Sequence, residues 1–210
     1  MKITDVHAHV FPDKLADKAA HSIGDFYGAA SYCAASVENL LREEQKAGIS
    51  RCVISNSAVT PHQVHDVNTF LASAAASHPS FVGFGSIYPG MDGFEEELDR
   101  IVSLGLRGLK IHPDFQKLPI DDPSGIETYR AVARRGLPVL FHMGDNRYDF
   151  SSPERLTNQI YPLAGGRTDV SSTAIRAQIR MTGECPAMLP GEVWELIKRY
   201  HLYGVSNLGE

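Results

Sequence analysis

The feature that most constrains this sequence is a regular alternation of short apolar runs with segments of helical apolar spacing. The apolar runs recur about every 30 residues after the first, a length typical of strand–helix units, and they lie at 3–9, 51–57, 81–88, 106–112 and 138–142. Between them, spacing such as that from Phe94 to Val102 indicates one apolar helix face. Strands that are apolar almost throughout are buried on both faces, so the sequence predicts a parallel sheet covered by helices.

A series of strand–helix units of this kind closes most naturally into a (β/α)8 barrel. The competing fold is an open doubly wound sheet, which commonly carries a GxGxxG motif after its first strand. The sequence has no such motif after 3–9. We therefore expect an α/β protein of the (β/α)8 TIM-barrel type.

The length of the chain limits this barrel. Of the 210 residues, 68 follow His142, whereas three more strand–helix units need about 90. The segment 157–189 shows no clear strand pattern, although 190–200 has the spacing of an amphipathic helix. We expect one barrel domain over 1–210, incomplete after the fifth strand, in which 1–156 follow the pattern and 157–210 are irregular or truncated.

Charge and cysteine content argue against several classes of protein. A net charge of -5 disfavours a broad basic surface for nucleic acid. The three cysteines form no CxxC pair, which disfavours a disulfide framework or a cysteine-based zinc site. The sequence shows neither a secretory signal nor an apolar run of about 18 residues. We expect a cytoplasmic protein without nucleic-acid or membrane partners.

The first predicted strand contains the clearest chemical signal, Asp5-Val-His7-Ala-His9. Residues two apart on a strand point to the same face, so His7 and His9 present their imidazoles side by side. Neutral imidazoles on one rigid strand suit zinc or a related divalent ion. Asp5 falls on the same face in this pattern and is expected to accept an N–H from a ligand histidine. Two ordinary histidines near a strand end are the alternative.

Two further predicted strands also end in histidine. The fourth ends in Lys110-Ile-His112-Pro and the fifth in His142. Barrel enzymes keep their active sites at these carboxyl ends, so we expect His142 to join His7 and His9 on one divalent ion, most simply zinc. Lys110 and His112 are expected to face the substrate. An ion pair for Lys110 and a helix-capping or turn role for His112 are the alternatives.

The segment after the fifth strand adds two charged candidates. Arg147 suits the binding of a substrate carboxylate, with a surface salt bridge as the equal alternative. Asp145 lies three residues beyond His142 and is a candidate catalytic proton acceptor. His62 and His65 lie near the same expected face, where solvated loop histidines are the commoner outcome.

Three of these motifs together resemble the amidohydrolase superfamily, in the amidohydrolase-related branch that includes aminocarboxymuconate-semialdehyde decarboxylase. They are Asp-Val-His-Ala-His at 5–9, Gly-Leu-Lys-Ile-His-Pro at 108–113 and Pro-Val-Leu-Phe-His-Met-Gly at 138–144. The resemblance covers 1–156. It implies a metal-dependent (β/α)8 barrel in which His7, His9 and His142 correspond to metal ligands.

Two motifs of that family are not found. Members carry a histidine in Ala-His-x-Gly-Gly at the end of strand six, which Leu-Ala-Gly-Gly at 163–166 only echoes. Members also carry a metal-ligating, proton-shuttling aspartate in Gly-x-Asp-x-Pro at the end of strand eight, and the tail reaches Glu210 without it. The resemblance therefore implies an incomplete family member with reduced activity, for which Asp145 and Glu210 are the nearest substitute carboxylates.

The leading expectation is a metal-dependent hydrolase that cleaves C–N or C–O acyl bonds of a small molecule. An anionic compound is one candidate for this substrate. Non-oxidative decarboxylation of a small carboxylic acid needs the same ligands and is the first alternative. A non-catalytic remnant or a partner-completed subunit is the second, and the open edges of an interrupted barrel favour self-association into a homo-oligomer. A metal-dependent nuclease is disfavoured, because the chain is acidic and lacks a lysine–arginine cluster.

Overall fold

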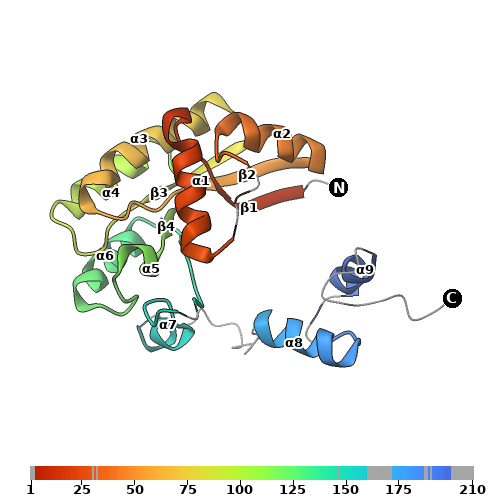
Figure 1. Cartoon of the computed structure of the whole chain (residues 1–210). Coiled ribbons are helices and arrows are strands. Elements are labelled where there is room, and N and C mark those ends of the chain that lie inside the picture. Colours follow the sequence, from red (N-terminus) through yellow and green to blue (C-terminus); the bar gives the residue numbers. More distant parts are fainter. Residues whose placement is uncertain are drawn as a thin grey trace. The chain divides into compact units, whose positions relative to one another are not determined.

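The computed structural model describes residues 3–29, 31, 33–145, 147–159, 172–186, 189 and 191–199. Contacts within the chain divide it into two compact units, Met1–Tyr161 and Pro162–Glu210. The first unit holds a parallel sheet and its helices (Figure 1). The described part of the second unit is helical.

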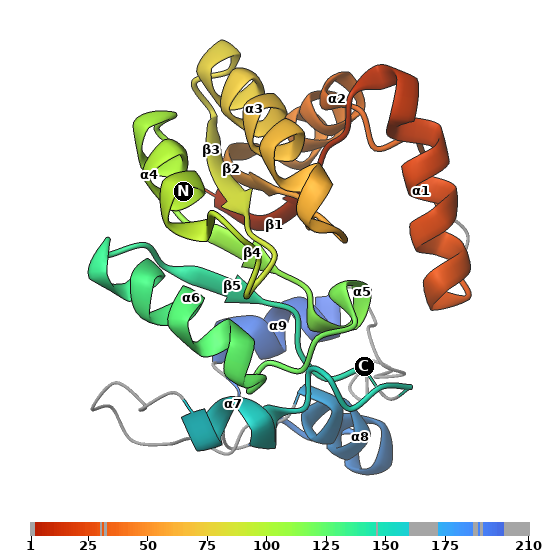
Figure 2. The same ribbon diagram turned by 90° about the vertical axis from the view of Figure 1, so that its left-hand side faces the viewer.

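The sheet of the first unit has five parallel strands, whose order in the sheet is their order in the chain. The strands are β1 (Ile3–His9), β2 (Ile49–Ser55), β3 (Phe81–Ser86), β4 (Leu109–Ile111) and β5 (Val139–Phe141). Figure 2 shows the sheet curling, with helices covering one face. Among the described residues the sheet ends at β5, which confirms the predicted fold class, a (β/α)8 barrel type that is incomplete after its fifth strand.

The helices of the first unit begin and end where local chemistry favours it. Helix α2 (Val37–Ala47) begins after Ser36, whose hydroxyl accepts the Asn39 N–H at 3.2 Å, and it ends at Gly48 with φ of 70°. Ser36 and Gly48 are residue types typical of these two positions, so the sequence alone already favours these boundaries. The other helices of this unit are α1 (Asp13–Tyr27), α3 (Pro61–Ser77), α4 (Phe94–Ser103), α5 (Pro113–Gln116), α6 (Pro123–Arg134) and α7 (Pro153–Gln159).

Helix α1 was not predicted from the sequence. It lies between β1 and β2 ahead of α2, so two helices rather than one connect these strands. Its buried residues are the small Ala16 and Ala20, which give a weak apolar pattern. The helix ends at Gly28, where φ is 65°. This helix contributes much of the wall of the cavity described below.

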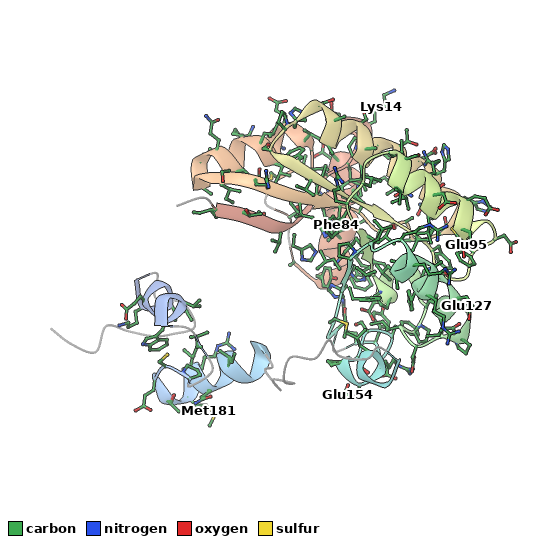
Figure 3. All side chains as sticks on the ribbon, turned by 180° about the vertical axis from the view of Figure 1, so that it is seen from behind. Lys14, Phe84, Glu95, Glu127, Glu154 and Met181 are labelled. Atoms are coloured by element: carbon green, nitrogen blue, oxygen red, sulfur yellow. The ribbon has the colours of Figure 1, made fainter. Side chains whose placement is uncertain are left out.

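The hydrophobic core lies between the sheet and the helices, and its fully buried members include Ile54, Leu71, Leu98 and Leu109. The opposite faces of the helices are charged. Glu95 on α4 and Glu127 on α6 project outward (Figure 3). Glu95 lies 2.6 Å from the guanidinium of Arg134, which joins α4 to α6 at the surface. The apolar helix spacing seen in the sequence therefore marks the faces that cover the sheet.

Strand β1 is an edge of the sheet among the described residues. It pairs with β2 on one side, and Val6 is 62% exposed. Its register shifts between Asp5, which lies opposite Cys52, and Ala8, which lies opposite Ile54. One extra residue of β1 is accommodated there, so the simple alternation of faces does not continue across this point.

The second unit contains α8 (Ser172–Thr182) and α9 (Gly191–Arg199), which pack through the buried Ile179 and Ile197. The predicted helix at 190–200 is confirmed by α9. The sequence features at 163–166 and at Glu210 lie outside the described residues. The expectation of one domain over 1–210 stays a prediction. No helix in the described ranges is long and apolar enough to cross a membrane.

The buried side chain of Asn68 on α3 forms hydrogen bonds to both β3 and α4. Its amide nitrogen donates to the Ser86 carbonyl at 2.9 Å and to the Glu97 carboxylate at 2.7 Å. Its oxygen accepts the Ser86 N–H at 2.7 Å. One side chain of α3 thereby satisfies groups of β3 and α4, in a position where unpaired polar groups are costly.

We expect Asn68→Leu to lower the free energy of unfolding by roughly 3 kcal/mol or more. The substitution leaves three buried groups without a hydrogen-bond partner, at a cost of about 1–3 kcal/mol each. Urea unfolding followed by circular dichroism measures the change. Gln45→Leu, the same kind of replacement at an exposed position of α2, is the control and should stay within about 0.5 kcal/mol. A loss below about 1 kcal/mol for Asn68→Leu would contradict this role.

Candidate metal site

A cavity of about 810 Å³ opens at the carboxyl ends of the strands, all within the first unit. Its wall is mainly apolar and comes largely from α1 and α3, including Leu15, Ile23, Phe26, Val67 and Phe70. Five histidines line it: His7, His9, His112 and His142 from three strand ends, and His62 from the first turn of α3. An apolar cavity with a few converging polar groups is the usual form of a small-molecule site.

His7 and His9 form the first pair of imidazoles. Their ring centroids lie 5.0 Å apart, as expected for neighbours on one face of β1. The Nδ1–H of His9 donates to the Ser55 carbonyl at 2.8 Å, which fixes the tautomer and leaves Nε2 with a free lone pair. Burial lowers the pKa of His9 to about 4. The pKa of His7 is also lowered, mainly by burial and to a smaller extent by the positive charge of Lys110.

His112 and His142 form the second pair, with parallel rings whose centroids are 3.9 Å apart. The Phe115 N–H donates to Nδ1 of His112 at 3.3 Å, so His112 caps α5, the alternative role that the sequence left open. A neutral ring that accepts at Nδ1 carries its proton on Nε2. Burial lowers the pKa of His112 to about 2, which keeps it neutral.

Tyr27 of α1 links the two rings of this second pair. The Nε2–H of His112 donates to the Tyr27 hydroxyl at 2.9 Å, and that hydroxyl lies 3.4 Å from Nε2 of His142. The lone pair of His142 Nε2 therefore faces the cavity as an acceptor. Tyr27 was not a candidate in the sequence, because the helix that carries it was not predicted.

Two buried charged groups lie beside these histidines without hydrogen-bond partners. Lys110 is fully buried, and burial lowers the pKa of its ammonium to about 8. Asp114 is 2% exposed, and neither carboxylate oxygen has a partner. The sequence pointed to Lys110 but not to Asp114. The only available signal was the position of Asp114 two residues after a histidine at a strand end.

Asp145 and Arg147 form a salt bridge with each other. Two Arg147 nitrogens lie 2.6 Å and 3.0 Å from Asp145 carboxylate oxygens, and this bonding lowers the pKa of Asp145 to about 2. The Arg147 guanidinium also stacks over the Phe26 ring at 4.2 Å. Among the described residues, neither Asp145 nor Arg147 lines the histidine cavity. Their catalytic and substrate-binding roles stay predictions.

Among the described residues, Asp5 makes no hydrogen bond to a histidine ring, and its carboxylate lies near Glu44 of α2 and Cys52 of β2. Its carboxylate accepts the backbone N–H of His7 at 2.9 Å. It forms a group with Glu44 and Cys52 whose ligand atoms lie within 4.8 Å of one another. The register shift after Asp5 is the physical reason, because it breaks the alternation on which the expectation of a shared face with His7 and His9 rested.

The histidines share a cavity without forming a single tight cluster. Among the described residues near the cavity, the ligand atoms of His112, Asp114 and His142 lie within 4.8 Å of one another. His7 and His9 are not members of that group. The predicted set of His7, His9 and His142 therefore lines one space, and an ion held by all three would draw the two pairs together. The donor set of neutral imidazoles and one buried carboxylate suits a divalent ion.

The fold and the histidine-lined cavity define an incomplete parallel α/β barrel with a candidate metal site at its strand ends. The sequence model of the family described as Amidohydrolase matches residues 4–191. The chain therefore belongs to the amidohydrolase family, which confirms the resemblance drawn from its motifs. A comparison with curated proteins found no match.

Solved structures with the same fold include two decarboxylases. The 5-carboxyvanillate decarboxylase of Novosphingobium aromaticivorans, complexed with manganese and a nitrobenzoic acid, is 16% identical with a TM-score of 0.53, over 75% of this chain and 53% of that one. A 2,6-dihydroxybenzoate decarboxylase is 18% identical with a TM-score of 0.53, over 69% and 51%. The apo IDCase of Metarhizium anisopliae is 16% identical with a TM-score of 0.55, over 67% and 50%. The chain spans about half the length of these neighbours.

Burial of the imidazoles makes stability depend on pH in the metal-free protein. The pKa of His9 is about 4 when folded and about 6.5 when unfolded, so below pH 6.5 the unfolded chain binds more protons. We expect His9 alone to reduce the free energy of unfolding by about 2 kcal/mol between pH 7 and pH 5. Urea titrations at the two pH values test this, and His9→Asn should show a correspondingly smaller pH dependence. Equal stability of the unaltered protein at both values would contradict it.

Proposed function

We propose that this protein is a metal-dependent hydrolase that cleaves C–N or C–O acyl bonds of a small molecule. The observation that carries the proposal is the convergence of His7, His9 and His142 on one cavity, with their pKa values lowered by burial. Histidine binds a metal through a neutral ring. The lowered pKa values keep these rings neutral to more acidic pH than free histidine.

The three histidines would hold the ion, with zinc as the first candidate and manganese as the second. His9 is prepared for this role, because its hydrogen bond to Ser55 fixes the ring and frees Nε2. His142 also presents a nitrogen lone pair to the cavity. When bound, a divalent ion supplies a Lewis acid that polarises a substrate carbonyl and makes water a stronger acid.

The remaining residues of the cavity bind and orient the substrate in this proposal. With His142 bound to the ion, the Tyr27 hydroxyl, which accepts from the Nε2–H of His112, would be free to donate to a substrate oxygen at the cavity wall. Phe26, Phe70 and Phe115 provide an apolar surface that holds a hydrocarbon or aromatic body and excludes water. The buried ammonium of Lys110 adds positive charge nearby, which favours an anionic substrate.

Decarboxylation of a small carboxylic acid is the second candidate. The mainly apolar cavity favours it, because loss of carbon dioxide requires no attacking water. It also requires no base to activate water, and the nearest carboxylate predicted for that task, Asp145, is held by Arg147. Hydrolysis and decarboxylation use the same histidines, so the site itself does not separate them.

A subunit completed by a partner, such as a second copy of the chain, is the third candidate. Among the described residues, β1 and β5 are the two edges of the sheet, and Ile3 and Val6 of β1 are exposed apolar side chains. Exposed parallel edges promote association with another chain. In this candidate the ion contributes to folding or assembly rather than to turnover.

We expect purified protein dialysed against zinc or manganese to retain up to one ion per chain, and His7→Ala to reduce the bound metal to background, because a ligand is lost. Atomic emission spectrometry measures the stoichiometry. His65→Ala, which removes a histidine whose side chain is 66% exposed on α3, is the matched control and should bind like the unaltered protein. A protein that retains neither ion after dialysis would overturn the proposed function.

A panel of small amides, esters and aromatic acids separates the candidate reactions. We expect the metal-loaded protein to cleave an amide or ester. His142→Ala should reduce the rate at least about 100-fold, because the ion that this ligand helps to hold contributes several kcal/mol of transition-state stabilisation. Release of carbon dioxide without hydrolysis would favour decarboxylation. Bound metal without turnover on any compound would favour the partner-completed subunit.

A further inference from the structure

We propose that Asp114 supplies the carboxylate ligand of the divalent ion, beside His142, and that His112 is a hydrogen-bond donor rather than a ligand. This inference rests on the proposed metal-dependent function and deepens it by naming the acidic ligand. Asp114 is the second residue of α5, directly after β4, and it lines the histidine cavity.

The first argument is the environment of the Asp114 carboxylate. The residue is 2% exposed, and both of its oxygens are buried without a hydrogen-bond partner. A buried carboxylate without a partner is strongly unfavourable, and such groups in native proteins are normally paired or bound to a metal. The nearby ammonium of Lys110 does not form an ion pair with it, since that nitrogen also has no partner. A cation in the cavity would satisfy the carboxylate.

The second argument is the distance between Asp114 and His142. Oδ2 of Asp114 lies 4.0 Å from Nε2 of His142, which is too long for a hydrogen bond. Two ligands held at about 2.0–2.2 Å from a tetrahedral zinc ion lie about 3.4 Å apart. A small closure would therefore place both atoms on one ion. The lone pair of His142 Nε2 accepts from the Tyr27 hydroxyl at 3.4 Å, a long contact that rotation of this hydroxyl would release to an ion.

The third argument separates His112 from the ligands, although its ring belongs to the same group of atoms. The Phe115 N–H occupies Nδ1, so Nε2 carries the proton and donates to Tyr27. A metal at Nε2 would require the proton to move to Nδ1, where it would oppose the Phe115 N–H. The capping bond of α5 thus fixes His112 as a donor.

The rival carboxylate is Asp145, which the sequence suggested for catalysis. Its side chain is nearly as buried as that of Asp114, at 4% exposed against 0%. Its oxygens, however, accept hydrogen bonds from Arg147. Withdrawing Asp145 toward an ion would break these charge-assisted bonds, whereas Asp114 has none to lose.

The test compares Asp114→Asn with Asp145→Asn in the whole chain. Zinc and manganese affinities are measured by competition with a chelating dye, and the cobalt-loaded proteins are compared by visible absorption. We expect Asp114→Asn to weaken zinc binding more than about 100-fold, beyond the 10–100-fold typical of an outer partner, and to change the cobalt spectrum. Asp145→Asn should leave both affinity and spectrum unchanged.

Thermal stability supplies an independent readout. Without metal, Asp114→Asn should melt at the same or a higher temperature than the unaltered protein, because a buried unpaired charge is removed. With saturating zinc, the unaltered protein should gain more stability than the variant. A purely structural carboxylate would give the opposite sign, with lower stability of the metal-free variant, and this result would overturn the inference.

The outcomes separate this inference from the proposed function. If the unaltered protein binds zinc and Asp114→Asn binds it equally well, the inference is wrong and the proposed function stands. If Asp145→Asn alone weakens binding, Asp145 is the ligand and Asp114 is not. If the unaltered protein binds neither zinc nor manganese, both proposals are overturned.

Discussion

The parallel pairing of neighbouring strands is the interaction on which the candidate site depends. Each helix returns the chain to the same end of the sheet, so the residues that follow β1, β2, β4 and β5 meet at one edge. Hydrogen bonds across the sheet extend this order to the strand ends, where the His142 N–H donates to the Ile111 carbonyl at 2.9 Å. Histidines more than a hundred residues apart in the sequence therefore share one cavity.

Several groups in or beside this cavity lower the stability of the folded protein. Lys110 and Asp114 are buried charged residues without partners, and the imidazoles of His9 and His112 are held far from their usual pKa values. Such features are costly unless a ligand or ion satisfies them, and they are concentrated at functional sites. The apolar core between the sheet and the helices supports them, with side chains such as Ile54 and Leu98 fully excluded from solvent.

Helix α1 forms one wall of the site and connects its parts. It lies between β1 and α2 in the chain, and its side chains form a large part of the cavity wall. Tyr27 reaches from this helix to the nitrogens of His112 and His142, while Phe26 contacts Phe115 and the guanidinium of Arg147. One helix thus connects the histidines, the aromatic wall and the Asp145–Arg147 pair.

The sequence by itself determined the strands, the helix from Ser36 to Gly48 and the histidines at the strand ends, because apolar periodicity and capping residues act over short distances. It did not reveal the place of Asp5, since one extra residue in β1 changes which face a side chain takes. Nor did it identify Asp114, because its burial without a hydrogen-bond partner is a property of the folded chain. Tertiary structure alone decided the pairing of Asp145 with Arg147 and the tautomer of His112, because each depends on atoms that only folding brings within hydrogen-bond distance.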